Sequence, residues 1–222
     1  MQWKTIKNEI GRYCASKVPN SGTIGLGSGT TSEAFIRALG ERTFHEPMKI
    51  QCVCSSKKTE EIARASHLPI ISIEQWDGTL TILFDGADAI DAQGTAIKGA
   101  GGALVREKIL AKAAERVVLM VDERKWLLPW QKCQLPLAII PFGKSYVQRE
   151  LVHMQLPHKE RIDFLTDDHL NILDVSLKSA PLETIDYACK QITGVVETGL
   201  FHQLATEIVI GYADGKIDHN KL

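Results

Sequence analysis

Residues 23–39, TIGLGSGTTSEAFIRAL, join a short apolar strand to a helix through a glycine-rich turn. Thr30 and Glu33 have the spacing of a capping box, which predicts that the helix begins at about Thr31, and Gly40 is expected to end it. Glycines let such a turn bring its backbone close to a ligand, and the free N–H groups at the helix start favour an anion. This turn is therefore either a phosphate-binding loop or simply a tight connection with capping hydroxyls.

Strands and helices alternate on both sides of this segment. Each expected strand is apolar along its whole length, which is typical of a parallel sheet that is covered on both faces. The pattern therefore predicts an α/β fold with an open, mostly parallel sheet. Helices are expected over 3–18, 31–39, 57–67 and 103–115, and strands over 23–27, 50–54, 70–73, 80–84 and 117–121.

The pattern changes after about Trp130, where the expected order becomes strand, helix, strand, strand, helix, strand. This order is the ferredoxin-like α+β motif, so a second and smaller domain is expected. A further apolar segment, 207–212, could return to the first sheet. The expected elements are strands over 135–141, 161–165, 171–175 and 194–197, and helices over 144–155 and 182–192.

Composition excludes several classes of function. The chain has 222 residues and a net charge of -1, so it lacks the strongly basic surface that is typical of nucleic-acid or membrane binding. The N-terminal segment has no signal-peptide core, so a cytoplasmic location is expected. The five cysteines are expected to be free thiols, and no His or Cys spacing indicates a metal site.

Two further loops carry groups that could do chemistry. The segment 84–91, FDGADAID, follows an apolar strand, and its carboxylates Asp85 and Asp88 could hold sugar hydroxyls, bind a metal or move protons. An Asp/Gly turn without a ligand explains the same residues. The segment 98–108, KGAGGALVREK, places Lys98 beside three glycines and Glu107 in the first turn of a helix. Glu107 could be a general base or a surface carboxylate that complements the helix dipole.

These loops are expected to converge because each follows a strand of one parallel sheet, and ligands bind at the carboxyl ends of such strands. The glycine-rich turn fits neither the phosphate loop that carries a conserved lysine nor the dinucleotide fingerprint. Hydroxyl and N–H groups for a phosphate, carboxylates for sugar hydroxyls, one lysine and one glutamate suit proton transfer on a phosphosugar.

At these residues the chain resembles type A ribose-5-phosphate isomerase. The segments GLGSGTT, DGADAID, IKGAGGALVREKIL and VDERKW have that family's order and spacing, and PLAIIPFGKSYVQREL, TDDHLNILDV and GVVETGLF resemble its later segments. The resemblance implies a Rossmann-like domain over 1–130 and 199–222 and a ferredoxin-like domain over 131–198. It also implies a homodimer or homotetramer, and interconversion of D-ribose 5-phosphate and D-ribulose 5-phosphate in the pentose phosphate pathway without metal or cofactor.

The resemblance also implies roles for individual residues. Glu107 matches the family's proton acceptor. In an enediolate mechanism Lys98 would then stabilise the developing negative charge, and Asp85 would transfer the hydroxyl protons and open the sugar ring. Asp88 would hold hydroxyls. The residues implied to contact the substrate are Ser28, Gly29, Thr30, Thr31, Asp85, Gly86, Ala87, Asp88, Lys98, Gly99, Ala100, Gly101 and Lys125.

Three positions depart from the family pattern. Ala89 follows DGAD where a glutamate is common, and Ala100 interrupts the glycines of the second loop. Residues 166–170, TDDHL, stand where TDNGN is frequent.

Alternative functions follow from the same elements. The chain could be a phosphosugar sensor without activity, although no DNA-binding segment precedes the fold. A coenzyme A transferase or an amino-sugar phosphate isomerase has a similar architecture, and the complete KGAGGALVREK segment argues against both. A nucleotide-binding oxidoreductase is disfavoured because the second strand is not followed by the expected acidic residue.

Overall fold

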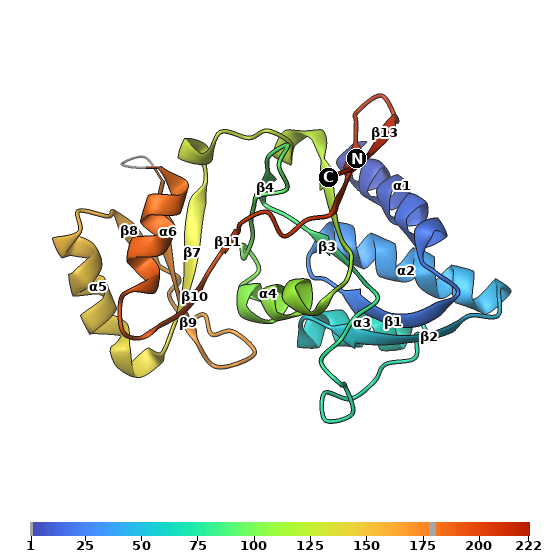
Figure 1. Cartoon of the computed structure of the whole chain (residues 1–222), viewed down its shortest axis with the longest axis horizontal. Coiled ribbons are helices and arrows are strands. Elements are labelled where there is room, and N and C mark those ends of the chain that lie inside the picture. Colours follow the sequence, from blue (N-terminus) through green and yellow to red (C-terminus); the bar gives the residue numbers. More distant parts are fainter. Residues whose placement is uncertain (1, 178–180) are drawn as a thin grey trace.

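A six-stranded sheet is the largest element of the computed structural model, which describes residues 2–177 and 181–222 (Figure 1). Its strand order is β13-β12-β6-β3-β1-β2, and every neighbouring pair is parallel except the β12–β13 hairpin. Buried apolar residues fill the central strands, and all six residues of β6 are buried. The strands are β1 (Ser21–Leu26), β2 (Lys49–Cys54), β3 (Ile82–Gly86), β6 (Val117–Asp122), β12 (Glu207–Gly211) and β13 (Ile217–Lys221).

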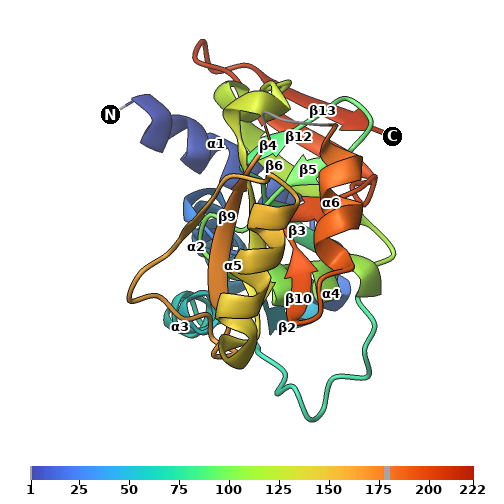
Figure 2. The ribbon, with the colours of Figure 1, turned by 90° about the vertical axis from the view of Figure 1, so that its left-hand side faces the viewer.

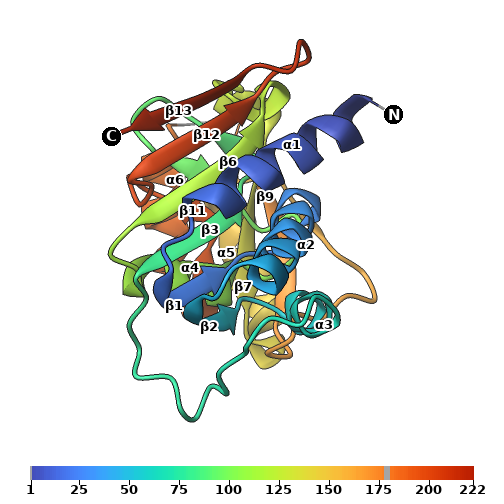
Figure 3. The ribbon, with the colours of Figure 1, turned by 90° about the vertical axis from the view of Figure 1, so that its right-hand side faces the viewer.

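Helices cover both faces of this sheet (Figure 3). On one face, α1 (Gln2–Lys17) and α2 (Thr30–His45) contribute Ile10 and Phe35 to a core that includes Ile82. On the other face, α4 (Leu104–Ala113) contributes Leu110 to a second core. The helix α3 (Lys57–Ala65) lies beside α2 at the β2 edge. The predicted α/β sheet with helices on both faces is thus confirmed.

A second sheet has four antiparallel strands in the order β10-β7-β9-β8. The helices α5 (Lys144–His153) and α6 (Leu182–Lys190) lie side by side on it (Figure 2) and share a core with Leu137 and Leu173. This arrangement confirms the predicted small α+β domain. Its strands are β7 (Gln134–Ile139), β8 (His158–Glu160), β9 (Asn171–Ser176) and β10 (Val195–Thr198).

The helix α4 lies between the two sheets. Its Leu104 packs on Ala138 and Ile172 of the small sheet, while Leu110 packs toward the large one. A short three-stranded sheet also connects the two parts. Its strand β11 follows the small domain in the sequence and precedes β12. Its strands are β4 (Ala89–Ile90), β5 (Ala96–Ile97) and β11 (Leu200–Phe201).

The structure corrects two predictions about α2. No side chain caps the helix, because its N-cap is Gly29 at φ 86° and the Thr30 hydroxyl instead accepts a hydrogen bond from Lys7 Nζ. The helix also continues through Gly40 to His45. Gly40 is required for a different reason: a Cβ at this position would overlap the backbone of Ser66.

Two predicted strands are also wrong. Residues 70–73 form an isolated bridge from Ile70 to Cys52 and no strand. Residues 161–165 form a loop, and the strand that pairs with β9 lies just before them, at His158–Glu160. The hairpin strand β13 and the short strands β4, β5 and β11 were not predicted from the sequence.

We propose a domain division at residues 1–130 with 199–222 and 131–198, because the strands of the two larger sheets fall on either side of these boundaries. No helix among the described residues is long and apolar enough to cross a membrane.

Candidate active site

The three predicted loops meet near the carboxyl ends of β1 and β3. These strands are parallel neighbours, so the turn after β1 and the acidic loop after β3 lie at the same edge. The prediction that each loop follows a strand of one parallel sheet is wrong for the second glycine loop, which follows β5 of the short antiparallel sheet. The backbone N–H of Ser28 donates to Asp85 Oδ1 at 3.1 Å, and its hydroxyl donates to Glu107 Oε1 at 2.6 Å. Ser28 therefore joins the acidic loop to helix α4.

Gly27 makes this approach of loops possible. A Cβ at Gly27 would overlap the Asp85 carboxylate, so the backbone of the first loop lies directly against that side chain. Asp85 is fully buried and also accepts the N–H of Gly86 at 2.7 Å. The glycine requirement here comes from close approach to a carboxylate.

Lys98 lies between the two buried carboxylates. Its Nζ is 2.9 Å from Asp85 Oδ2 and 3.3 Å from Glu107 Oε1, and it also donates to the carbonyl of Gly86. The side chains of all three charged residues are at most 5% exposed. One cation thus compensates two carboxylates that are almost completely removed from water. An unpaired charge would be very costly in such a place.

Burial and charge shift the pKa values of this cluster. Burial raises the pKa of Asp85 to about 7, while the Lys98 ammonium opposes the increase and Glu107 adds to it. Burial alone would lower the pKa of Lys98, but the carboxylates of Asp85 and Glu107 outweigh burial and raise it. Lys98 therefore stays protonated, and Asp85 is able to bind and release a proton near neutral pH.

Glu107 is placed by the start of α4. It is the fourth residue of this helix, and its N–H donates to the carbonyl of Ala103. Its Oε1 contacts Ser28 and Lys98, whereas its Oε2 has no hydrogen-bonding partner among the described residues. One oxygen is therefore anchored, and the other is buried without a partner among the described residues, so its lone pairs are available to accept a proton.

The acidic loop also contacts the second glycine loop and Lys125. Asp88 Oδ2 accepts the N–H of Ala100 at 2.8 Å, and Asp88 Oδ1 is 3.9 Å from Lys125 Nζ. Lys125 Nζ donates to the carbonyl of Ala87 at 2.6 Å. Burial lowers the pKa of Lys125, an effect that Asp88 opposes.

The start of α2 provides the anion-binding end of the site. The first intrahelical bond runs from Glu33 N to Gly29 O, so the N–H groups of residues 30–32 precede the helical ladder. Lys7 Nζ lies 2.8 Å from Thr30 Oγ1 and adds a positive charge. N–H groups, hydroxyls and an ammonium group together suit a phosphate.

A cavity of about 190 Å³ connects these groups. Asp85 is a predicted site residue that does not line it, because Asp85 lies beneath Lys98 and is fully buried. The structure therefore brings all the predicted residues together but leaves Asp85 behind the cavity wall. The lining residues are Ser28, Gly29, Thr30, Thr31, Gly86, Ala87, Asp88, Lys98, Gly99, Ala100, Gly101, Glu107 and Lys125.

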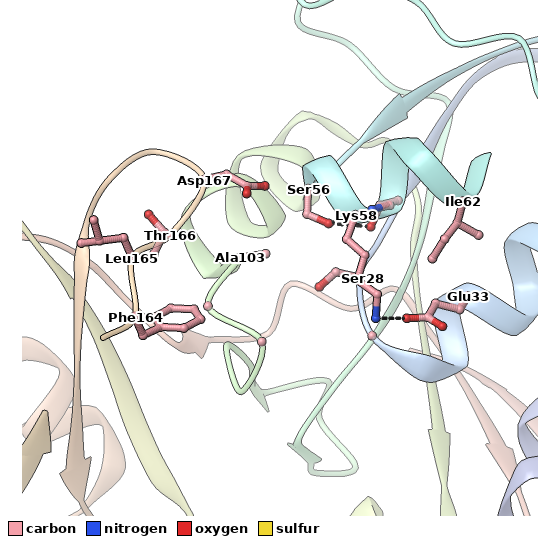
Figure 4. Close-up of a pocket in the computed structure, with 14 residues that line it drawn as sticks. Ser28, Glu33, Ser56, Lys58, Ile62, Ala103, Phe164, Leu165, Thr166 and Asp167 are labelled. Carbon is pink, nitrogen blue, oxygen red and sulfur yellow. Dashed lines mark hydrogen bonds and ion pairs between the residues drawn. The ribbon is translucent and has the colours of Figure 1, made fainter. Parts of the chain in front are cut away.

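A second hollow of about 230 Å³ adjoins the first and shares Ser28, Gly29 and Gly101 with it. Figure 4 shows the loop 164–167 of the small domain on one side of this groove and Ser56 and Lys58 on the other. The Asp167 carboxylate accepts the N–H of Lys57 at 2.7 Å, so the small domain contacts the start of α3.

Sequence reasoning missed Lys7 and the small-domain loop. Lys7 reaches the site because α1 packs closely on α2, where a Cβ at Gly11 would overlap the backbone of Ala34. A lysine on the first helix gives no sequence signal for such a contact. The sequence predicts a strand over 161–165, where the structure has a loop. Because of this wrong prediction, nothing in the sequence indicated that residues 164–167 lie beside the active site.

The described residues contain no group of three or more His, Cys, Asp or Glu side chains that could hold a metal ion. The residues that line the cavity supply carboxylates, lysines, hydroxyls and backbone amides. An α/β fold with these groups at the carboxyl edge of its sheet defines an enzyme that moves protons on a small phosphorylated substrate.

Comparison with known proteins gives the family. Residues 51–215 match the family model described as ribose 5-phosphate isomerase A (phosphoriboisomerase A). Ribose-5-phosphate isomerase A 1 of Oceanobacillus iheyensis is 35% identical over 214 residues, which cover 94% of this chain and 95% of the relative. The chain belongs to the ribose 5-phosphate isomerase A family.

Solved structures agree with this assignment. The crystal structure of ribose 5-phosphate isomerase A from Neisseria gonorrhoeae is 31% identical, with a TM-score of 0.89, and the match covers 98% of this chain and 96% of that one. A D-ribose-5-phosphate isomerase in complex with phospho-erythronic acid is 27% identical, with a TM-score of 0.90 and coverage of 98% of both chains. The Rossmann-like fold expected from the resemblance is thus confirmed.

Proposed function

We propose that the protein interconverts D-ribose 5-phosphate and D-ribulose 5-phosphate, with Glu107 as the base that moves a proton between carbon 2 and carbon 1. The observation that carries this proposal is the division of the Glu107 carboxylate: Oε1 is held by Ser28 and Lys98, and Oε2 has no partner among the described residues. A carboxylate that is anchored on one side and unpaired on the other is positioned to accept a proton.

The reaction begins with the open-chain sugar and forms an enediolate. Glu107 Oε2 takes the proton from carbon 2, the electron pair forms the carbon 1–carbon 2 double bond, and the carbonyl oxygen becomes negative. Lys98 stabilises that charge from its fixed position beside both carboxylates. Glu107 then returns the proton to carbon 1, and the hydroxyl proton moves between the two oxygens.

We assign the hydroxyl proton and ring opening to Asp85, acting through Lys98. Asp85 does not line the cavity, but its Oδ2 is 2.9 Å from Lys98 Nζ, which does. A pKa of about 7 lets Asp85 give a proton to Lys98 as Lys98 gives one to the sugar oxygen. Asp88 faces the same cavity, where it holds sugar hydroxyls.

The substrate phosphate binds at the start of α2. Thr30 and Thr31 lie there beside Lys7, and Lys125 lines the same cavity. The phosphate end is then positive, while the reacting end holds two carboxylates and one ammonium group. This distribution orients a sugar that carries its phosphate on the carbon farthest from the carbonyl.

We further propose that the protein is a cytoplasmic homodimer or homotetramer. The support for an oligomer is that several large apolar side chains of the small domain are exposed, and a contact between subunits would bury such side chains. Phe142, on the turn Pro141–Gly143, is fully exposed, and Tyr187 on α6 is 69% exposed. Light scattering of the purified protein measures the subunit number directly.

The reaction itself is tested with EDTA-treated protein and ribose 5-phosphate in deuterated water, followed by proton NMR. We expect ribulose 5-phosphate to appear, with deuterium entering carbon 1 to the extent that the base exchanges its proton with solvent. Full retention of hydrogen also agrees with a shielded base, and the Glu107→Gln variant then decides. Folded protein that gives neither product nor exchange would refute the proposal and favour a sensor.

A further inference from the structure

Arg161 of the small domain holds the backbone of the second glycine loop. It follows β8, and its Nη1 donates to the carbonyl of Gly99 at 3.0 Å and to the carbonyl of Ala100 at 2.8 Å. The other side of the guanidinium pairs with Asp174 on β9, at 2.7 and 2.6 Å. Arg161 does not line the catalytic cavity, and the mechanism above does not use it.

The two carbonyls belong to peptide groups whose N–H groups serve the active site. The carbonyl of Gly99 shares its peptide with the N–H of Ala100, which donates to Asp88. The carbonyl of Ala100 shares its peptide with the N–H of Gly101. Gly101 lines the cavity, and its amide has no acceptor among the residues that the structure describes. Arg161 thus binds the far side of two consecutive peptide groups that serve the site.

A cation at this place has two physical effects. It polarises both peptide groups, and this strengthens the hydrogen bonds that their N–H groups donate. It also restrains a glycine-rich loop, in which Gly99 and Gly102 have φ angles of 107° and 84° that favour glycine. Phe164 adds to the second effect, since it lies against Gly102, with its ring 5.8 Å from the guanidinium.

We propose that Arg161 is a positioning residue for the isomerase reaction. It aligns and polarises the Gly101 amide so that this N–H donates to the oxygen that becomes negative in the enediolate, and it keeps Asp88 in place through Ala100. The inference rests on the proposed function. It makes the small domain a working part of the active site, because both Arg161 and its partner Asp174 come from that domain.

The test compares Arg161→Met and Arg161→Lys with the wild-type protein, well below the melting temperature of each. Methionine keeps the length of the stem and removes the charge, whereas lysine keeps the charge and loses the fork that spans two carbonyls. The control is Asp168→Asn, which breaks the 2.6 Å ion pair between Arg106 and the same small-domain loop and leaves the Arg161 contacts intact.

Four quantities are measured: kcat, KM, and the inhibition constants of phospho-erythronic acid and inorganic phosphate. With its phosphate at the start of α2, we expect the acid to place its carboxylate where the enediolate charge develops, and we expect inorganic phosphate to occupy only the start of α2. Since loss of one complete oxyanion donor costs about 10²–10³ in kcat, we expect a misaligned donor in Arg161→Met to cost about tenfold. The inhibition constant of phospho-erythronic acid should rise by a similar factor, while KM and the inhibition constant of phosphate should stay nearly unchanged.

Arg161→Lys is expected to lie between wild type and Arg161→Met, and Asp168→Asn to match wild type. An active wild-type protein whose Arg161→Met variant keeps its kcat and its affinity for phospho-erythronic acid within twofold would overturn the role of Arg161. Equal weakening of both inhibitors, or an equal loss in Asp168→Asn, would also overturn it, because either indicates general disorder of the site. A folded wild-type protein without turnover would refute the proposed function itself.

Discussion

Glu107→Gln separates the proposed base from every structural role of the same side chain. Glutamine has the same shape, and its carbonyl oxygen can keep the contacts of Glu107 Oε1 with Ser28 at 2.6 Å and Lys98 at 3.3 Å. The amide nitrogen replaces Oε2, which has no partner among the described residues, so no protein contact is lost. Lys98 still pairs with Asp85, and we expect the free energy of unfolding to fall by about 1–3 kcal/mol, because the amide N–H groups are buried without an acceptor among the described residues.

Turnover should respond very differently, because an amide cannot accept the proton from carbon 2. Positioned general bases contribute about 10²–10⁴ in rate. At 1.36 kcal/mol for each factor of ten, this loss raises the barrier by about 2.7–5.4 kcal/mol. We expect kcat to fall by this factor while KM changes little, since Glu107 is not among the groups that bind the phosphate.

The assay follows the conversion of ribose 5-phosphate by NMR, with thermal melting of the same samples. Glu115→Gln is the matched control, because Glu115 lies just beyond the other end of α4 and is exposed. Its kcat should equal that of the wild-type protein. If folded Glu107→Gln retained kcat within tenfold of wild type, the assignment of the base would be wrong.

Two further substitutions test other parts of the site, and a pH titration tests Lys108, a buried lysine of α4 that pairs with Glu197 and does not line the cavity. Thr31→Ala should raise KM with little change in kcat, because phosphate binding is shared by ground and transition states; a steady-state titration with ribose 5-phosphate that shows a kcat loss at constant KM would contradict this. Gly27→Ala should lower kcat and cost about 1–3 kcal/mol in a denaturant titration, because the added methyl overlaps the buried Asp85 carboxylate; unchanged activity would mean that Asp85 can move freely. Burial lowers the pKa of Lys108 from 10.5 to about 8, so between these pH values the unfolded chain binds the additional proton and stability rises with pH, by up to about 3 kcal/mol. Urea titrations at pH 7.5 and 10.5 should show this rise relative to Lys108→Met, and parallel curves for the two proteins would exclude it.

Two loops of the catalytic cluster were predictable because they follow neighbouring strands of the large parallel sheet. Once β1 and β3 are neighbours, Ser28 and Asp85 must meet at their carboxyl ends, and their separation along the chain does not matter. The glycine-rich segment before α4 placed Lys98 and Glu107 at the same edge. Strand order alone therefore explains the positions of Ser28 and Asp85, whereas the segment with Lys98 follows β5 of the short antiparallel sheet.

The rest of the site depends on packing that no local pattern encodes. Gly40 resembles a helix end, yet α2 continues because α2 packs on Ser66 where only a glycine fits. Arg161 stands in a segment that is predicted as a strand, but the strand ends at Glu160. The Arg161 N–H still donates to Ile172 of β9, while its side chain reaches the glycine loop. Lys7 depends in the same way on the contact between two helices.

The position of β12 in the sheet affects the order in which the chain can fold during synthesis. β6 is complete at Asp122, but its partner on one side, β12, is made only after the whole small domain. Until then β6, whose six residues are all buried in the finished protein, presents an unpaired apolar edge that could pair with another chain. The small domain is continuous in sequence and can fold first. The last sixteen residues, from Glu207 onward, then close the large sheet, so an interrupted translation product would be the form most exposed to aggregation.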